Sequence, residues 1–452
     1  MDEGGPSLPE IAKEKDWLGN SSILNPMRRS HRHHASFRLY LVSLVAFGAV
    51  TAAAILLTRG YTLDTQTGRI AKTGLVIVRS LPSSAYITVN GRVRQERTPA
   101  RLKLQPGSYT IKVDKPGSKP FEKPLEIAAE TATFEEDILL FREPVEERVL
   151  AENVIRQASS PDHRQLAYLQ SAPEGVTLSV TSAGGTPTKL TTLGVAYRAP
   201  ITLAWSADAG AIVSSTATET TITPLSGTPV TVPVGGAVSL TPGSRNEVLA
   251  VTAGRLNRHT AGAPPTPISG DVIAWTVSSA GVYVATTDAT VTRYDLRSDA
   301  KRVVSSGLLM TDLRAAETTE DVFGRTSDRT LYHLTPDAQT ATRVATDVDQ
   351  YQSSQGFLSY LSRQEIHVWK KAPEHDRLVT RLGAPIDETL PISDGKYVLY
   401  TQGGNIHAIA VDGTNDVVLA KAGSAPLTLL DETALATIDP AGRLRTFGII
   451  DR

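Results

Sequence analysis

The sequence of 452 residues contains no cysteine. Disulfides, thiolate nucleophiles and cysteine-based zinc or iron–sulfur sites are therefore excluded. An excess of one charge is also missing, because 46 Lys and Arg residues stand against 47 Asp and Glu residues. A nucleic-acid-binding protein would show a basic excess or stripe, so nucleic acid is not expected as a partner. Aromatic residues make up only 6% of the chain, whereas Thr and Val recur throughout, which favours β structure.

Motifs of common catalytic sites are missing as well. The sequence has no H-E-x-x-H, no G-x-S-x-G, no Walker A loop and no EF-hand loop. We therefore expect no enzymatic activity, no cofactor and no metal site. Asp162, Asp208 and Asp394 recur at equivalent turns and are interpreted as turn residues, since Asp side chains bond nearby backbone N–H groups. Asp347 and Asp349 resemble half of a cation site that lacks a third ligand.

A single long apolar run, residues 39–58, contains no charge over twenty residues. A helix of that length is about 30 Å long, close to the thickness of a bilayer's hydrocarbon core. Its Leu, Ile, Val and Phe residues favour insertion by about −3 to −6 kcal/mol. A cleavable signal peptide is the alternative, but 38 residues precede the run and the small residues 51–54 lie inside it. The run predicts an uncleaved transmembrane helix.

The flanks of this run suggest an orientation. Residues 1–38 form a polar tail that ends in a basic flank, and residues 59–72 form a short polar stem with fewer basic residues. This bias favours a cytoplasmic N-terminus and extracytoplasmic C-terminal domains. The expected location is therefore the cell membrane, crossed once. The basic residues before the run are Arg28, Arg29, Arg32 and Arg38, and those after it are Arg59, Arg69 and Lys72.

Residues 73–141 change to an alternating apolar and polar pattern. Asn90 and Gly91 lie between two such stretches and predict a two-residue hairpin, since both turn positions need a positive φ. About seven short strands in this length predict a small β-sandwich. An acidic stretch near the end of this segment is interpreted as a solvated strand end. Its residues are Glu135, Glu136, Asp137, Glu143, Glu146 and Glu147.

This segment resembles the PEGA domain family. The family pattern is S-x-P, a small turn, a V-x-V-x-G hairpin, T-P and a P-G-x-Y turn. The eponymous Pro-Glu-Gly-Ala reads Pro-Ser-Ser-Ala here, so the turn is kept without its acidic residue. The resemblance implies a non-enzymatic module of surface proteins, often beside a membrane anchor; a generic spacer is the alternative. The residues that carry the resemblance are Gly74, Ser80, Pro82, Ala85, Val89, Gly91, Thr98, Pro99, Leu104, Pro106, Gly107, Tyr109 and Gly117.

Residues 144–452 contain a repeat of about 38 residues, each with a polar turn followed by an apolar strand position. A period near 40 with several short strands predicts the blades of a β-propeller. We expect about eight blades, with seven as the alternative if one weak repeat is an insertion. The fold class is thus mainly β, with one N-terminal transmembrane helix. The strand positions that mark the repeats are Leu166, Ile212, Val248, Val282, Val322, Leu358, Val398 and Leu435.

The first repeat is similar to those of the periplasmic Tol-system propeller. Ser160, Pro161 and Asp162 form its S-P-D turn, and a G-G-x-P ending starts at Gly184. The last repeat stops before an outer strand, whereas residues 147–154 resemble such a strand. We therefore expect an N-terminal strand to complete the last blade and close the ring.

Trp205 and Trp275 occupy equivalent repeat positions and are the candidate ligand contacts. Packing between blades and a platform for stacking sugars are both open interpretations. The leading hypothesis is a membrane-anchored surface protein that presents its propeller to an envelope protein or a glycan. Two other hypotheses stay open. One is an envelope lyase or glycoside hydrolase that uses the propeller channel, and the other is a component of an envelope assembly.

Overall fold

The structure is a computed structural model of the full chain, which divides into two compact units, residues 1–72 and residues 73–452. The residues that it describes are 33–58, 61–63, 70–198, 202–241, 243–278, 280–316, 320–335, 339–354, 357–371, 374–392, 395–424, 426–431 and 433–451.

The first unit contains the helix α1 (His33–Thr58) and a hairpin of β1 (Tyr61–Leu63) and β2 (Ile70–Lys72). Its segment Leu39–Leu56 has a mean hydropathy of 2.3 and is not buried in the protein, so by length and composition it can cross a membrane. The helix begins six residues earlier than predicted, and the hairpin lies where the sequence predicts a polar stem. The rest of the predicted tail, residues 1–32, lies outside the described residues.

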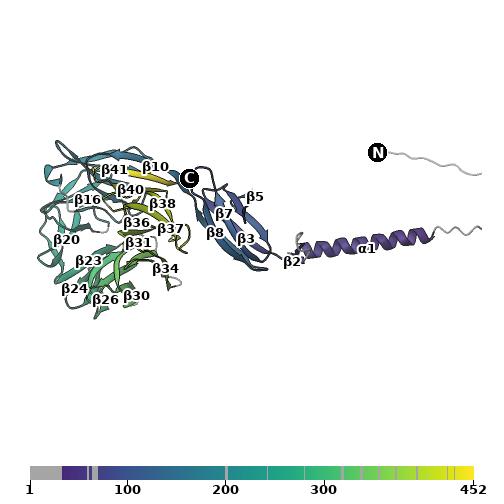
Figure 1. The fold of residues 1–452 in the computed structure, drawn as a ribbon. Helices are drawn as coiled ribbons and strands as arrows, with labels where there is room; N and C mark the ends of the chain where they lie inside the picture. Colours follow the sequence, from purple (N-terminus) through teal and green to yellow (C-terminus); the bar gives the residue numbers. More distant parts are fainter. Residues whose placement is uncertain are drawn as a thin grey trace, which may run out of the picture. The chain divides into compact units, whose positions relative to one another are not determined.

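Two sheets form the predicted sandwich (Figure 1). Asn90 and Gly91 have φ values of 46° and 77°, which confirms the predicted hairpin turn. Inward residues such as Val76, Ile87 and Ile111 make its core. One sheet has the strand order β6-β3-β9 and the other β5-β4-β7-β8. Their bounds are β3 (Gly74–Leu81), β4 (Tyr86–Val89), β5 (Arg92–Arg97), β6 (Ala100–Leu104), β7 (Gly107–Asp114), β8 (Phe121–Ile127) and β9 (Ala132–Leu139).

Four-stranded antiparallel sheets, here called blades, follow along the chain (Figure 1). Blade 1 consists of β11 (Val154–Ser159), β12 (Gln165–Ala172), β13 (Gly175–Ser182) and β14 (Thr188–Leu193). Blade 2 consists of β15 (Thr202–Trp205), β16 (Ala211–Ser215), β17 (Thr220–Pro224) and β18 (Val230–Val232), after the short 3-10 helix Val195–Arg198. Blade 3 consists of β19 (Val238–Leu240), β20 (Glu247–Thr252), β21 (Arg255–Thr260) and β22 (Thr266–Ser269). Blade 4 consists of β23 (Val272–Ser278), β24 (Gly281–Thr286), β25 (Thr290–Tyr294) and β26 (Lys301–Ser306).

The remaining blades repeat this order. Blade 5 consists of β27 (Met310–Ala315), β28 (Val322–Thr326), β29 (Leu331–Thr335) and β30 (Thr340–Ala345). Blade 6 consists of β31 (Val348–Ser354), β32 (Phe357–Ser362), β33 (Glu365–Lys371) and β34 (Glu374–Arg381). Blade 7 consists of β35 (Glu388–Ile392), β36 (Tyr397–Gln402), β37 (Asn405–Ala410) and β38 (Val417–Lys421). Blade 8 consists of β39 (Thr428–Leu429), β40 (Ala434–Ile438), β41 (Leu444–Ile450) and β10 (Phe141–Ala151).

Hydrophobic packing between neighbouring blades holds the ring together. Every marker position of the repeat lies in the second strand of its blade and is completely buried, which confirms the register of the repeat. A core cluster fills each space between blades that follow one another in the chain. A further cluster packs Leu166 and Tyr168 of blade 1 against Ala436 of blade 8. Blades 1 and 8 are therefore neighbours, and the ring closes.

The closing strand is the one expected from the sequence. β10 pairs antiparallel with β41, and Arg148 lies opposite Thr446 (Figure 1). The ion pair between Glu147 and Arg445 joins the same two strands. The prediction that an N-terminal strand completes the last blade is confirmed.

The strand order gives the propeller two different faces. Because the strands of a blade alternate in direction, the turns after the first and third strands lie on one face. The turn after the second strand and the connection to the next blade lie on the opposite face. We call the first the junction face, which carries Lys396 and Asp412, and the second the free face, which carries Arg329 and Arg363.

Candidate functional site

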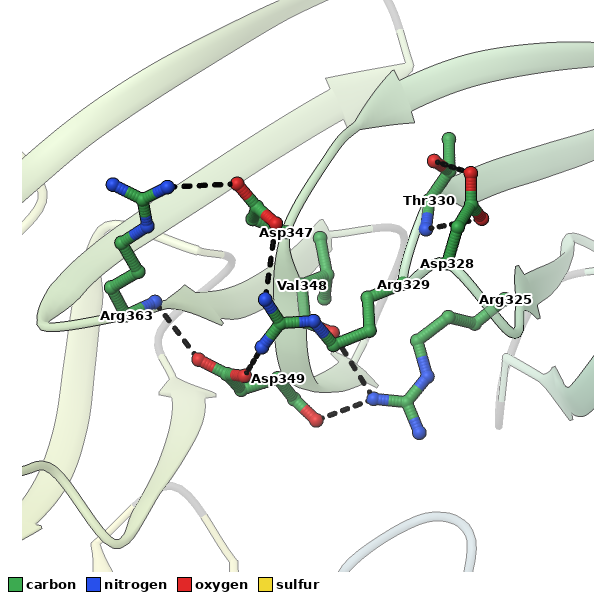
Figure 2. A network of polar contacts seen from close by, with 8 residues as sticks. All are labelled: Arg325, Asp328, Arg329, Thr330, Asp347, Val348, Asp349 and Arg363. Atoms are coloured by element: carbon green, nitrogen blue, oxygen red, sulfur yellow. Dashed lines mark hydrogen bonds and ion pairs between the residues drawn. The ribbon is translucent and has the colours of Figure 1, made fainter.

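A network of ion pairs on the free face joins blade 5 to blade 6 (Figure 2). Arg329, in the turn between β28 and β29, donates to Asp347 at 3.0 Å and also contacts Asp349. Arg363, in the turn between β32 and β33, contacts the other oxygen of Asp347 at 3.1 Å. Its backbone N–H donates to Asp349 at 2.9 Å. Arg325 donates to the backbone carbonyls of Val348 and Asp349, so the connection between the blades is held from both sides.

The backbone of this network has an uncommon conformation. Arg329, Asp347 and Arg363 have φ values of 64°, 57° and 59°. Side chains other than those of Asn and Asp rarely adopt this left-handed region, and such residues persist where surrounding contacts determine them. The guanidinium groups occupy the oxygens of Asp347 and Asp349, so the interpretation of these two acids as half of a cation site is wrong.

An open hollow of about 660 Å³ lies beside the network on the free face. Pro385 and the buried Ile386 contribute apolar surface to its lining. Arg363 and Arg381 also line it, and their side chains are 77% and 73% exposed. Arg363 pairs with Asp347, and Arg381 pairs with Glu365, which also lines the hollow. The apolar surface is therefore bordered by exposed polar side chains, as in many protein–protein interfaces.

The two tryptophans lie in spaces between blades. Trp205 of β15 packs in the cluster between blades 1 and 2, and its indole N–H donates to the carbonyl of Ala158 at 2.9 Å. Trp275 of β23 packs in the cluster between blades 3 and 4. Both are half-buried. These positions fit the packing interpretation, and the structure does not bring the two side chains to one site.

The repeated aspartates stabilise turns, as predicted. Asp162 accepts hydrogen bonds from the Ser160 hydroxyl at 2.6 Å and from the Arg164 N–H at 3.2 Å. Asp208 makes equivalent contacts with Ser206 and Gly210 in blade 2. It also accepts hydrogen bonds from the two terminal guanidinium nitrogens of Arg245 in blade 3. The hydrogen bonds from Arg245 hold the pKa of Asp208 well below its usual range. Asp394 lies outside the described residues.

Among the described residues, no group of three or more His, Asp and Glu side chains has the arrangement of a metal site.

Blades 6 and 7 contain a Tyr–His–Asp group that the sequence analysis did not identify. Tyr400 stacks on His407 with ring centres 4.7 Å apart, and both donate to Asp416, at 2.6 and 3.2 Å. In blade 6, Tyr360 stacks on His367, which contacts Asp376 at 3.1 Å. The spacing of seven and nine residues is identical in both blades, and that repetition is the signal that would have revealed them.

The stability of the propeller is expected to depend on the protonation of His367. Burial lowers the pKa of His367, but its hydrogen bonds to Asp376 and Glu365 outweigh burial, so the pKa lies above the usual 6.5. The contacts of the protonated imidazole stabilise the folded state. This contribution is fully present below pH 6.5, the usual pKa, and is lost as the pH rises through the higher pKa of the folded state. Between pH 6 and 8 the unfolding temperature should therefore fall more steeply in the native protein than in His367→Gln. Equal slopes in the two proteins would contradict this expectation.

The sandwich is joined to the junction face of blade 7 by polar contacts. Lys123 of β8 makes ion pairs of 2.8 Å with Glu135 of the sandwich and with Asp412 of the propeller. Burial lowers the pKa of Lys123, but the hydrogen bonds to the two acids raise it above its usual value. Asp137 also pairs with Lys396 of the propeller. The interpretation of the acidic stretch as a solvated strand end is therefore wrong for Glu135 and Asp137, whereas Glu143 and Glu146 are exposed.

Side chains of the propeller also cover the edge strands of the sandwich. The N–H of Leu139 at the end of β9 donates to the hydroxyl of Tyr397 at 3.1 Å. The N–H of Glu122 in β8 donates to the side chain of Asn415 at 2.9 Å. Phe141 packs edge-to-face on Tyr397, and it belongs to a core cluster shared with blades 7 and 8. Edge amides that are covered in this way make the sandwich and the propeller one structural unit.

Replacing Lys123 with methionine should weaken this joint. The change leaves Glu135 and Asp412 close together without their shared cation, which costs about 1–3 kcal/mol. Calorimetry of the full chain should then resolve a separate unfolding transition that the native protein lacks. Lys103→Met is the matched control, because Lys103 is an exposed strand lysine of the same sandwich. A single unchanged transition in Lys123→Met would contradict the expectation.

The comparisons with known proteins fit this architecture. Residues 73–136 match the family described as "PEGA domain". No curated protein matches the sequence significantly. The crystal structure of the C-terminal WD40 domain of Sif2 is 13% identical with a TM-score of 0.50, and the match covers 68% of this chain and 99% of that domain.

Two further solved structures have TM-scores below 0.5, too low to support an argument. The WD40 domain of SCAP from fission yeast is 10% identical with a TM-score of 0.46, covering 68% of this chain and 98% of that one. Porphyromonas gingivalis dipeptidyl peptidase 4 is 11% identical with a TM-score of 0.47, and the match covers 64% of this chain and 56% of that one. The chain therefore carries a PEGA domain, followed by a propeller whose fold is similar to that of WD40 domains.

Proposed function

We propose that the chain is a single-pass membrane scaffold that holds its propeller outside the cytoplasm and binds a protein partner on the free face. One helix able to cross a membrane, a PEGA domain and a propeller support this proposal. The partner that we propose is an envelope protein. Binding of a glycan is the alternative outcome of the experiment described below.

The joint between the sandwich and the propeller is the observation that carries the proposal. It uses the junction face of blade 7, through Lys396, Tyr397 and Asp412. The hollow beside Arg363 lies on the opposite face and remains open. A module that is fixed on one face and open on the other suits presentation of a binding surface.

Membrane anchorage should depend on the middle of α1. Gly48→Arg places a charge near the helix centre, which costs about 2.5–3.5 kcal/mol of insertion free energy. We expect this variant to lose much of its resistance to alkaline extraction from membranes. Leu39→Arg is the control, since a charge at the end of the span can reach the interface. A native chain that is extracted as readily as the variant would refute the anchor.

The orientation and the partner can be tested with single cysteines, because the chain has none. Gln364→Cys, at the hollow, should react with a membrane-impermeant maleimide on intact cells. A photo-crosslinker at the same position should give a discrete product that contains one protein. The matched position is Asp162 on the junction face, where no such product is expected. Labelling only after lysis would refute the orientation, and saturable glycan binding without a protein product would favour the glycan.

A further inference from the structure

The edge of the sandwich that faces away from the propeller is strongly basic. β5 and β6 are edge strands of their sheets, at the ends opposite β8 and β9, each of which donates one backbone N–H to a propeller side chain. Between residues 92 and 104 the only acidic residue is Glu96. The basic residues of this edge, here called the basic edge, are Arg92, Arg94, Arg97, Arg101 and Lys103.

The basic edge differs from the rest of the protein, whose charges are balanced and widely paired. All six residues of β5 are exposed, as are Arg101 and Lys103 of β6. Within the part of the chain that the structure describes, none of the five basic side chains forms an ion pair. Arg97 instead lies over the ring of Tyr86 at 4.1 Å. These cations are therefore free to meet an external anionic surface.

An apolar side chain projects from the same strand. Val93 lies between Arg92 and Arg94 and is 68% exposed. It lies two residues after Gly91 of the tight turn, opposite Thr88, so it lies near the tip of a hairpin. Basic residues that flank an exposed apolar residue are typical of segments that bind at a membrane interface.

The covalent path from the apolar helix to the sandwich is short. α1 ends at Thr58, and the hairpin that follows pairs Tyr61 with Lys72. The sandwich begins at the next residue, Thr73. The segment between the helix and the sandwich therefore has 14 residues, 59–72, and a chain of that length spans at most about 50 Å when fully extended, which limits how far the sandwich can lie from the membrane.

We propose that the basic edge binds the anionic phospholipid headgroups of the bilayer in which α1 is anchored. This inference rests on the membrane anchorage proposed above. Each basic residue near an anionic surface strengthens binding roughly fivefold, and Val93 adds apolar contact at the headgroup boundary. Such binding would fix how the propeller is held above the membrane, since the sandwich and the propeller are joined.

The test uses the full chain with Gln95→Cys as its only cysteine, labelled with a fluorophore that responds to lipid. The protein is reconstituted in vesicles of phosphatidylcholine, alone or with roughly 30% phosphatidylglycerol. A neutral variant carries Arg92→Gln, Arg94→Gln, Arg101→Gln and Lys103→Gln. The matched control removes four exposed basic residues of the propeller, through Lys189→Gln, Arg255→Gln, Lys301→Gln and Lys421→Gln.

We expect quenching by lipid-borne quenchers to be at least about threefold stronger with phosphatidylglycerol, and to weaken in high salt. The neutral variant should lose this difference and the control variant should keep it. Equal quenching in both vesicles, or a difference that the neutral variant retains, would overturn the inference. So would full competition by soluble glycerol phosphate at low concentration. Alkaline extraction of the same vesicles separates the two proposals, since a chain that is not retained would refute the anchor itself.

Discussion

Asp321→Ala should lower the free energy of unfolding by about 1–3 kcal/mol, because it removes the carboxylate that the buried imidazole of His333 contacts. Asp321 lies between β27 and β28, and its side chain is only 10% exposed. Its carboxylate accepts hydrogen bonds from Nε2 of His333 at 2.7 Å and from Nζ of Lys371 at 2.6 Å. Lys371 belongs to blade 6, so the carboxylate joins two blades.

The surroundings of His333 explain the size of the effect. Its ring lies 5.3 Å from Phe323 and 5.1 Å from Trp369, measured between ring centres, and only 5% of the side chain is exposed. Water therefore has little access to replace the lost carboxylate. An imidazole N–H that loses a buried partner keeps its full desolvation penalty. Asp321→Asn keeps an acceptor oxygen, so its effect should be smaller.

Thermal and urea unfolding of the full chain measure this effect. The matched control is Asp328→Ala in the same blade, since Asp328 is exposed and bonds only Thr326 and Thr330 of its own turn. The control should change stability much less. If Asp321→Ala were no more damaging than Asp328→Ala, the group around His333 would contribute little. If Asp321→Ala does not fold, Asp321→Asn still supplies the comparison.

The fold could be predicted in large part because its signals are local. The hairpin at Asn90 needs two neighbouring residues with positive φ, and both are visible in the sequence. The repeat could be recognised because every second strand is buried on both sides, so the same apolar pattern recurs at Leu166, Ile212 and the other marker positions. The closing strand could be predicted because residues 147–154 resemble the outer strand of a blade.

The candidate site could not be predicted, because its contacts join residues from different blades. Nothing in the local sequence of Asp347 indicates Arg329 and Arg363 as its partners. The acids near residue 135 resemble any exposed strand end, and only the folded chain brings Lys123 and Asp412 to them. The Tyr–His–Asp groups were detectable in principle, since their spacing repeats, but two copies make a weak signal.

A disulfide across the closing strands should stabilise the propeller by about 5–6 kcal/mol. Arg148 and Thr446 lie opposite each other in β10 and β41, 298 residues apart in the chain. Opposed residues of antiparallel strands have Cα atoms about 4.5–5.5 Å apart, which suits a disulfide. Because the chain has no cysteine, Arg148→Cys with Thr446→Cys can form only this bond.

The large effect follows from the length of the loop that the bond closes. A disulfide stabilises mainly by restricting the unfolded chain, and this restriction grows with loop length. The matched control is Thr177→Cys with Thr192→Cys, which also joins a third strand to an outer strand but closes a short loop within blade 1. The closing disulfide should exceed the control by roughly 2–3 kcal/mol.

The same comparison decides whether the ring opens at the joint between β10 and β41 before the rest unfolds. If it does, the closing disulfide also slows unfolding, because it blocks the first step, whereas the local disulfide leaves that step unchanged. Unfolding rates in denaturant, with and without reductant, measure this directly. Equal unfolding rates with the two bonds would mean that the ring's ends separate only with the whole fold. A lower unfolding rate with the closing bond alone would show that β10, the strand that continues from the sandwich, is the first part of the propeller to open.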